Sequence, residues 1–203
     1  ILRTTGIYES QLFNILSEHI DKYSNVNVAF LPSYLGVDIR ISSTNKKSYS
    51  SLSETIQSKI GDYIFSEDNT TLEEVVAKTL IRNKITISTA ESCTGGLISD
   101  RLTNVPGVSS VYIGGLVAYS NIQKINLLNV KEKTLLNHGA VSEKTAIEMA
   151  VGARKRFDSD IGISTTGIAG PDGGSPEKPI GLVYIGFSSK TISKSYKFEF
   201  NHD

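Results

Sequence analysis

From residue 70 onward, short β-branched runs alternate with segments of helical periodicity, and no other feature limits the possible fold as strongly. Strand-like runs occupy residues 85–89, 161–165 and 182–187. Segments whose apolar residues have helical spacing precede the first run and lie between the first and the second. This order of segments indicates a layered α/β domain. Residues 181–200 have the pattern of a hairpin pair, so we expect the sheet to be mixed.

The first 69 residues have a different character, since they are rich in Ser, Asn and Tyr and contain three of the seventeen glycines. Two helical segments and two strand-like runs are expected there, at residues 10–20, 50–60, 26–30 and 35–41 respectively. We therefore predict a small α+β module over residues 1–69, followed by the α/β domain over residues 70–203. Thr71 and Glu74 form a capping-box pattern at the start of the second domain.

Charge and cysteine content argue against several classes of function. The sequence has 21 basic and 21 acidic residues, which disfavours nucleic-acid binding through bulk electrostatic attraction. The single cysteine, Cys93, excludes an internal disulfide and a multi-cysteine zinc site, and the three histidines are far apart, so no metal is expected. There is no apolar run of membrane-spanning length and no signal-peptide pattern, so we expect a cytoplasmic protein without a membrane partner. Because the chain begins with Ile1, we also expect it to be a fragment of a longer protein.

Residues 90–96 join a β-branched strand to a helix through two glycines. This placement puts a hydroxyl and free backbone N–H groups at a helix N-terminus, which suits an anion or a developing oxyanion. Ser92 is a candidate nucleophile, and Cys93 competes for that role because a thiol at a helix N-terminus can have a lowered pKa. The structural alternative is a helix cap at Ser92 or Thr94 beside a small buried cysteine. An imidazole partner would have to be His138, whose turn-like position favours a structural role.

Tyr119 and Lys124 form a second candidate group, at the end of a predicted strand over 111–119 and the start of a short helix over 122–128. Strand ends are where an α/β sheet presents functional side chains, so both residues would approach Ser92 if their strands are neighbours. A lysine in a dry pocket can act as the base for a serine. Taken in isolation, Lys124 is more typical of a solvated helix surface.

Residues 165–174 contain four glycines and a proline after a strand, and no helical pattern follows them. The loop lacks the Gly-Lys-Ser/Thr of a Walker motif and the spacing of the dinucleotide-binding fingerprint. Loops this rich in glycine wrap a ligand or turn sharply, and we expect ligand binding here.

Together these segments resemble the C-terminal domain of the CinA (competence/damage-inducible protein) family, in the family's order and spacing. The matching segments are residues 90–96, 118–121 with Lys124, 138–143, 166–174 and 177–181. Residues 1–69 resemble the KH-like module that precedes this domain in the family, and residues 4–10 are similar to the exit from a nucleotide-hydrolysing first domain. The resemblance implies that the first domain is missing and that the amidase domain over 70–203 is truncated at its C-terminus.

The resemblance also implies a function: a nicotinamide-nucleotide amidase that hydrolyses the carboxamide of nicotinamide mononucleotide (NMN) to nicotinic acid mononucleotide and ammonia. It implies a homodimer that needs no metal or cofactor. Ser92 would be the nucleophile that forms an acyl-enzyme, and Tyr119 and Lys124 would assist proton transfer, with Lys124 as the base. Backbone N–H groups from Thr94 to Gly96 would stabilise the oxyanion. The implied substrate-binding residues are Glu91, Thr94, Gly95, Gly96, Asn121, Thr166, Gly167, Gly170, Gly173 and Gly174.

Two other functions stay open. One is a module without catalytic activity that binds pyridine nucleotides or mediates oligomerisation for the missing first domain. The other is RNA binding by the KH-like region, which clamps nucleotides with a GXXG loop in KH domains. We disfavour RNA binding because residues 8–69 contain no GXXG, and residues 1–70 carry six basic against eight acidic residues.

Overall fold

The computed structural model describes residues 1–200 of the chain. Contacts between residues divide the chain into two compact units, Ile1–Val75 and a second unit from Val76 onward. Each unit is built on one β-sheet, four-stranded in the first and five-stranded in the second. The predicted fold class, a layered α/β domain with a mixed sheet preceded by a small α+β module, is confirmed.

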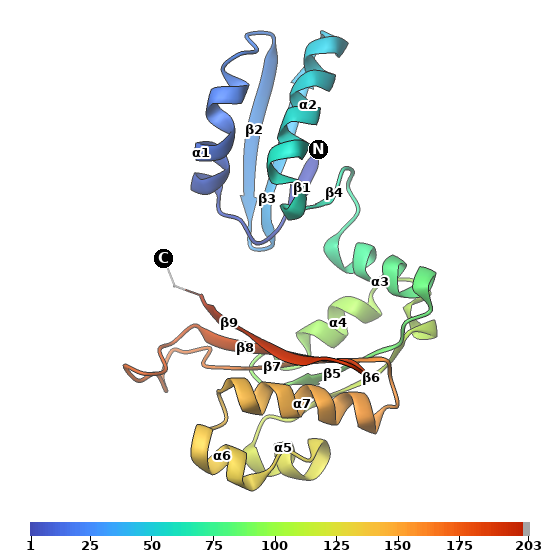
Figure 1. Cartoon of the computed structure of the whole chain (residues 1–203), viewed down its shortest axis with the longest axis vertical. Helices are drawn as coiled ribbons and strands as arrows, with labels where there is room; N and C mark the ends of the chain where they lie inside the picture. The colour runs from blue at the N-terminus through green and yellow to red at the C-terminus, as the bar shows by residue number, and fades with distance from the viewer. Residues whose placement is uncertain (201–203) are drawn as a thin grey trace. The chain divides into compact units, whose positions relative to one another are not determined.

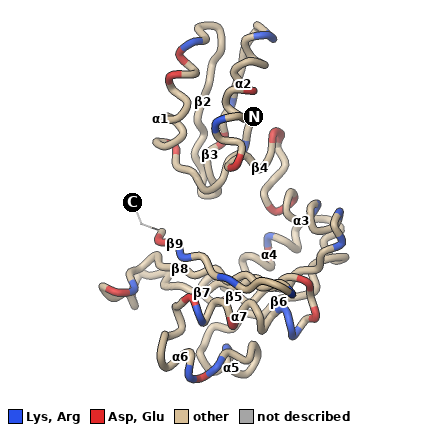
Figure 2. The backbone as a smooth tube through the Cα atoms, viewed as in Figure 1, with Lys and Arg blue, Asp and Glu red and all other residues tan. Residues whose placement is uncertain are grey.

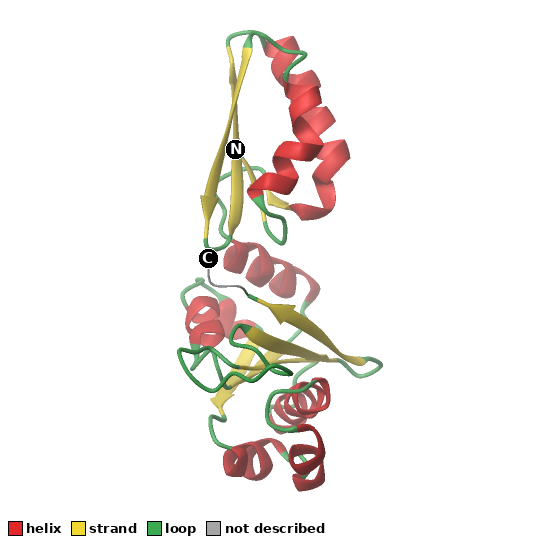
Figure 3. Cartoon of the chain, turned by 90° about the vertical axis from the view of Figure 1, so that its left-hand side faces the viewer, coloured by secondary structure: helices red, strands yellow, loops and turns green. Residues whose placement is uncertain are grey.

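The first unit is an antiparallel sheet with two helices on one face (Figure 3). Its elements are β1 Leu2–Thr4, α1 Glu9–Ile20, β2 Val26–Ser33, β3 Gly36–Ser43, α2 Lys46–Ile60 and β4 Ile64–Ser66, with strand order β2-β3-β1-β4. Apolar residues four positions apart on one helix face, such as Leu12 and Leu16 of α1, are fully buried against the strands. Strand β1 was not predicted from the sequence, because three residues are too few to show alternation.

The second unit begins within helix α3, Leu72–Asn83, and contains the mixed sheet. Its further elements are β5 Ile87–Glu91, α4 Leu97–Thr103, β6 Tyr112–Val117, α5 Asn121–Leu128, α6 Glu132–His138, α7 Glu143–Arg156, β7 Ile161–Gly167, β8 Leu182–Ser188 and β9 Ser193–Glu199. The strand order is β6-β5-β7-β8-β9, in which β6, β5 and β7 are parallel. β7, β8 and β9 pair antiparallel, so the predicted hairpin at the end of the chain is confirmed.

Helices cover both faces of this sheet, with α7 on one face and α3 and α4 on the other (Figure 1). On the α7 face, the Ser164 hydroxyl of β7 donates to the carbonyl oxygen of Ala146 at 2.6 Å. A Cβ at Gly186 of β8 would lie 2.2 Å from that same oxygen, so glycine is needed for the helix backbone to approach the strand. On the opposite face, Ala77 and Leu80 of α3 belong to the same apolar core as the strand β5.

Helix α6 was absent from the sequence analysis, which placed a turn at His138 and Gly139. Only Thr134 and Leu135 of its seven residues are buried, and two residues are too few for a recognisable apolar period. The turn itself is present at the end of the helix, where Gly139 has a left-handed φ of 77°.

The parallel strands bring the predicted site segments to one edge of the sheet. β5 ends at Glu91, β6 at Val117 and β7 at Gly167, and these carboxyl ends are neighbours because the strands run in the same direction. The candidate segments that follow each strand therefore meet, although they are far apart in the sequence.

Gly152 of α7 provides a test of this packing, because a Cβ there would lie 2.0 Å from the carbonyl oxygen of Leu128 in α5. We expect Gly152→Ala to lower the free energy of unfolding by about 1–3 kcal/mol, since overpacking outweighs a gain in helix propensity of about 1 kcal/mol. Urea unfolding followed by circular dichroism measures this change. Gly61→Ala is the control, because no atom lies within 4 Å of its added Cβ. Equal stability of both variants would contradict the packing.

Candidate active site

Ser92 lies immediately after β5, at the edge where the parallel strands end. All five residues of β5 are buried, and Ser92 itself is 8% exposed. The Ser92 N–H donates to the carbonyl oxygen of Thr165 on β7 at 3.1 Å, which extends the pairing of the two strands to this residue. The strand register therefore fixes the backbone that carries the candidate nucleophile.

Lys124 reaches Ser92 from the first turn of α5. The lysine is 1% exposed, and its Nζ lies 3.0 Å from Ser92 Oγ. The Nζ also donates to the carbonyl oxygens of Ala118 and Tyr119, at 2.9 and 3.2 Å. The interpretation of Lys124 as a solvated surface lysine is wrong, because the structure buries it beside Ser92.

Burial lowers the pKa of the Lys124 ammonium, and the nearby Cys93 offsets only part of that effect. As an ammonium, Lys124 donates one hydrogen each to Ser92, Ala118 and Tyr119. As a neutral amine, it keeps two donors for the two carbonyl oxygens and points its lone pair at the Ser92 hydroxyl. The same arrangement thus accommodates a protonated lysine and a lysine that accepts the serine proton.

Glu91, expected to contact substrate, is instead 0% exposed and bound within the turn after β5. Its carboxylate accepts five hydrogen bonds, from the N–H groups of Gly96, Ile98 and Ser99 and from the hydroxyls of Thr94 and Ser99. Burial raises the pKa of the Glu91 carboxyl, but the hydrogen bonds, led by the Ser99 hydroxyl, outweigh burial and lower that pKa. The start of α4 therefore holds the protein's own carboxylate, which corrects the expected role of Glu91.

The expected oxyanion donors also need correction. The Gly96 N–H donates to Glu91, and the Gly95 N–H donates to the carbonyl oxygen of Ser92 at 3.1 Å. Among residues 1–200, the N–H groups of Cys93 and Thr94 donate to no oxygen and lie beside the Cys93 sulfur, a weak acceptor. These two N–H groups, and not those of the two glycines, are the donors left next to Ser92.

Cys93 is half-buried beside the same site. Burial raises the pKa of its thiol, and the neighbouring N–H groups, the Thr165 hydroxyl and Lys124 do not outweigh that effect. The thiolate, which is the reactive form of cysteine, is therefore disfavoured at neutral pH. His138 is exposed at the end of α6 and does not line this site, so the structure brings no imidazole to Cys93 from that position.

A cavity of ≈ 310 Å³ surrounds Ser92 and Lys124. The predicted site residues that line it are Ser92, Tyr119, Lys124, Thr166, Gly167, Gly170 and Gly173. The predicted residues outside its lining are Glu91, Thr94, Gly95, Gly96, Asn121 and Gly174. The lining also contains Ile168, Ala169 and Asp172, which lie in the loop expected to bind ligand but were not named individually as site residues. Ala140 and Val141 also line the cavity; they lie in the family-matching segment 138–143, for which no binding role was predicted.

Two side chains tie the walls of this cavity together. Lys178, after the Gly-rich loop, donates from Nζ to the carbonyl oxygens of His138 and Val141, at 2.7 and 2.8 Å. The Thr166 hydroxyl donates to the carbonyl oxygen of Ala140 at 2.8 Å. These contacts hold the connection between α6 and α7 against the end of β7 and the loop that follows it.

Tyr119 lies in the lining, but its side chain is not bound to the Ser92–Lys124 pair. The residue is 74% exposed, and its carbonyl oxygen, not its phenol, accepts the hydrogen bond from Lys124. Within the described part of the chain the phenol makes no hydrogen bond. The structure thus shows a backbone contact from Tyr119 and leaves its role in proton transfer as a prediction.

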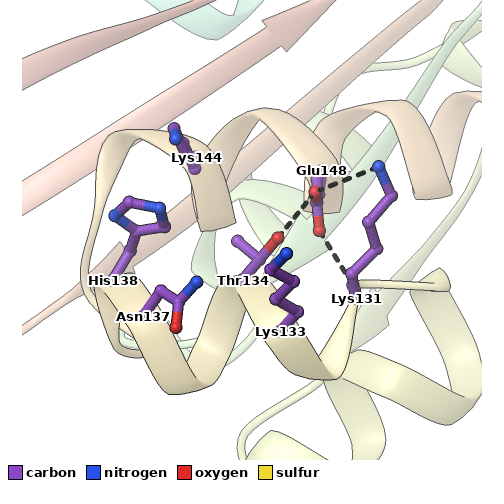
Figure 4. Close-up of a pocket in the computed structure, with 7 residues that line it drawn as sticks. All are labelled: Lys131, Lys133, Thr134, Asn137, His138, Lys144 and Glu148. Atoms are coloured by element: carbon purple, nitrogen blue, oxygen red, sulfur yellow. Dashed lines mark hydrogen bonds and ion pairs between the residues drawn. The ribbon is translucent and has the colours of Figure 1, made fainter.

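A second cavity of ≈ 340 Å³ lies at α6 and α7 (Figure 4). Its lining residues are Lys131, Lys133, Thr134, Asn137, His138, Lys144 and Glu148. The Glu148 carboxylate accepts hydrogen bonds from the Lys131 N–H at 2.8 Å and from the Thr134 hydroxyl at 2.9 Å. The Thr134 hydroxyl is already bound to Glu148, and the three lysines of this cavity are exposed. We therefore assign the candidate active site to the Ser92 cavity.

Three further properties concern residues 1–200. In this part of the chain no group of three or more His, Cys, Asp or Glu side chains is placed to hold a metal ion. No helix found among these residues combines the length and apolar character needed to cross a membrane. Basic and acidic residues are interspersed along the backbone of both units (Figure 2).

Comparison with protein families covers nearly the whole chain. Residues 69–203 match the model of the CinA C-terminal domain, and residues 1–66 match the Damage-inducible protein CinA KH domain. The chain belongs to the CinA family. Ser92, Lys124 and the cavity around them all lie within the CinA C-terminal domain.

Proteins named competence-damage inducible protein are similar along the whole chain. The protein from Clostridium perfringens is 46% identical over 209 residues, covering 100% of this chain and 50% of its own length. The protein from Caldicellulosiruptor saccharolyticus is 46% identical over 211 residues, covering 100% and 51%. The chain thus spans about half the length of the curated CinA relatives it matches.

Solved CinA structures are similar to about two thirds of the chain. The competence/damage inducible protein from Agrobacterium tumefaciens is 38% identical with a TM-score of 0.61, covering 67% of this chain and 86% of its own. The CinA superfamily protein from Escherichia coli is 35% identical with a TM-score of 0.63, covering 65% and 77%.

The environment of Cys93 generates a prediction about its reactivity. Because burial raises the pKa of the thiol, we expect iodoacetamide to alkylate Cys93 at pH 7 about 10-fold more slowly in the folded chain than in guanidinium. Mass spectrometry measures the rate, and the unfolded chain is a matched control because it contains the same single cysteine. Faster alkylation of the folded chain at pH 7 would contradict a raised pKa.

Proposed function

We propose that the CinA C-terminal domain of this chain is a nicotinamide-nucleotide amidase, which hydrolyses the carboxamide of NMN to nicotinic acid mononucleotide and ammonia. The observation that carries the proposal is the 3.0 Å contact between Lys124 Nζ and Ser92 Oγ at the wall of the cavity. A buried amine beside a serine suits acyl transfer, because the amine accepts the hydroxyl proton during attack. The identity of the amide is taken from the resemblance of the motifs to the CinA family.

In the first half-reaction, Ser92 Oγ attacks the carboxamide carbon while its proton moves to neutral Lys124. The oxygen of the tetrahedral intermediate accepts hydrogen bonds from the N–H groups of Cys93 and Thr94. Lys124 then transfers the proton to the carboxamide nitrogen, the C–N bond breaks, and ammonia leaves. The products of this half-reaction are ammonia and an ester between the nicotinoyl group and Ser92.

In the second half-reaction, water attacks the ester carbon and gives a proton to Lys124. The bond from that carbon to Ser92 Oγ breaks, and Lys124 returns the proton to the serine. Nicotinic acid mononucleotide leaves, and both side chains are restored. One lysine serves both half-reactions because its Nζ lies beside Ser92 Oγ, next to the carbon from which ammonia leaves and which water later attacks.

The Gly-rich loop offers groups for the ribose and phosphate of the nucleotide. Gly170 and Gly173 have left-handed φ angles of 80° and 92°, and such backbone can present successive N–H groups to an anion. Within residues 1–200 these two N–H groups make no hydrogen bond. Asp172 between them lines the cavity, and a carboxylate there can accept hydrogen bonds from ribose hydroxyls.

The nucleophile is tested by two neighbouring substitutions. We expect Ser92→Ala to lower the rate of ammonia release from NMN by about 10³-fold or more, because the acyl-enzyme cannot form. Cys93→Ala is the matched control and should keep a rate close to that of the wild type, since the thiol is not the attacking group. A coupled assay for ammonia measures both rates.

Loss of activity in Cys93→Ala with normal activity in Ser92→Ala would overturn this assignment. Binding of NMN by the wild-type chain without ammonia release would instead favour the module that binds pyridine nucleotides without catalysis.

The role of Lys124 predicts a pH profile. Only neutral Lys124 accepts the serine proton, so kcat/KM should rise with pH through the pKa of Lys124 and level off below its ordinary value of 10.5. Lys124→Arg should abolish activity, because a guanidinium stays protonated. Lys131→Ala should leave the profile unchanged, since that side chain is 78% exposed in the other cavity. A profile that still rises above pH 10.5 would contradict the effect of burial.

A further inference from the structure

We infer that Glu91 is a positioning residue for Ser92: its carboxylate holds the turn at residues 92–96 so that two N–H groups remain beside the nucleophile. The inference deepens the proposed function and rests on it only in taking Ser92 as the nucleophile. Glu91 touches no reacting atom, because its side chain is fully buried behind the turn and outside the cavity.

The carboxylate is bound on both oxygens by donors from the turn and from α4. Oε2 accepts from the Thr94 hydroxyl at 2.7 Å and from the N–H groups of Gly96 and Ile98, each at 3.0 Å. Oε1 accepts from the N–H and the hydroxyl of Ser99, at 2.8 and 2.6 Å. The side chain next to Ser92 thus ties the turn to the first residues of the following helix.

A second set of contacts closes a ring around Ser92. The Thr94 hydroxyl, which donates to Glu91, lies 2.7 Å from the Thr165 hydroxyl on β7. The carbonyl oxygen of Thr165 in turn accepts from the Ser92 N–H at 3.1 Å. Two residues of the turn are therefore held to β7: Ser92 through its N–H, and Thr94 through the hydrogen bond between its hydroxyl and that of Thr165.

These bonds decide which backbone donors are free. The Glu91 carboxylate accepts from the N–H groups of Gly96, Ile98 and Ser99. The N–H groups of Ser92 and Gly95 donate to carbonyl oxygens. The two exceptions in this turn, within the described residues, are the N–H groups of Cys93 and Thr94, which donate to no oxygen. Both lie beside the Cys93 sulfur, which is only a weak acceptor, so an oxyanion formed at Ser92 would find these donors one and two residues after the nucleophile.

Glutamine cannot replace this carboxylate, although its shape is nearly the same. Backbone N–H groups point at both Oε1 and Oε2, so an amide NH2 at either position would face a donor. Hydroxyls can rotate to accept, but the N–H groups of Gly96, Ile98 and Ser99 cannot. Glu91→Gln therefore displaces the turn while changing the side-chain volume little.

The experiment measures how fast a fluorophosphonate labels Ser92 in the full 203-residue chain. This probe is suitable because the phosphonyl oxygen of its serine adduct occupies the oxyanion position, and no nucleotide is needed for the reaction. We expect labelling of Glu91→Gln to be about 100-fold slower than labelling of the wild type, since small displacements of reacting groups have effects of this size. Mass spectrometry of the modified peptide gives the rate, and circular dichroism confirms that each variant is folded.

The matched control is Glu148→Gln. Glu148 also accepts hydrogen bonds from a backbone N–H and a hydroxyl at a helix start, but it lies in the other cavity. It should therefore label at the wild-type rate. If Glu91→Gln does not fold, Ser99→Ala removes one donor to Glu91 and should slow labelling to a smaller extent.

The outcomes separate the two proposals. If folded Glu91→Gln is labelled at the wild-type rate, the positioning role is overturned and the proposed amidase is untouched. The same holds for Ser99→Ala where it replaces that variant. If Glu91→Gln is labelled slowly and the wild-type chain releases no ammonia from NMN, the positioning role of Glu91 is supported and NMN is rejected as the substrate. A wild-type chain in which Ser92 is never labelled would overturn both.

Discussion

The hydrogen bond between Lys124 and Ser92 is the interaction on which the candidate active site depends. Removing an ammonium from water costs several kcal/mol unless it is well paired. In the described structure Nζ contacts a hydroxyl and the carbonyl oxygens of Ala118 and Tyr119, and none of these carries a charge. They satisfy the hydrogen-bonding capacity of the lysine without the stabilisation that a carboxylate would give. Burial therefore lowers the pKa of Lys124 and prepares it to exchange a proton.

The sheet and its helices supply the rigid frame for this contact. The Ala118 N–H donates to the carbonyl oxygen of Glu91 at 2.8 Å, so the segment after β6 continues alongside β5. Ala118 and Tyr119 then lead into α5, which carries Lys124 in its first turn. Gly152 allows α7 to approach the end of α5 closely. The position of a single amine thus depends on two strands and two helices.

Glu91 and Lys124 are both buried near Ser92, but their surroundings give them opposite tasks. Five donors surround Glu91 and lower the pKa of its carboxyl, which keeps it a fixed anion. Neutral acceptors surround Lys124, which favours a movable proton. One charge holds the geometry of the turn, and the other takes part in chemistry. This difference in role explains why Glu91, although adjacent in sequence to the candidate nucleophile, is absent from the cavity lining.

The sequence by itself determined the α/β class, the hairpin at residues 181–200 and the turn after β5, because periodicity and glycine placement are local properties of the chain. Family motifs added the grouping of Ser92 with Lys124. Only the tertiary structure decided that Lys124 is buried, that Glu91 faces inward and that α6 forms. Burial depends on contacts with distant residues, such as the 32 positions between Ser92 and Lys124, and no local pattern encodes them. Hydrogen-bond partners are decided in the same way. Only the folded chain therefore shows that, within residues 1–200, the N–H groups of Cys93 and Thr94 donate to no oxygen.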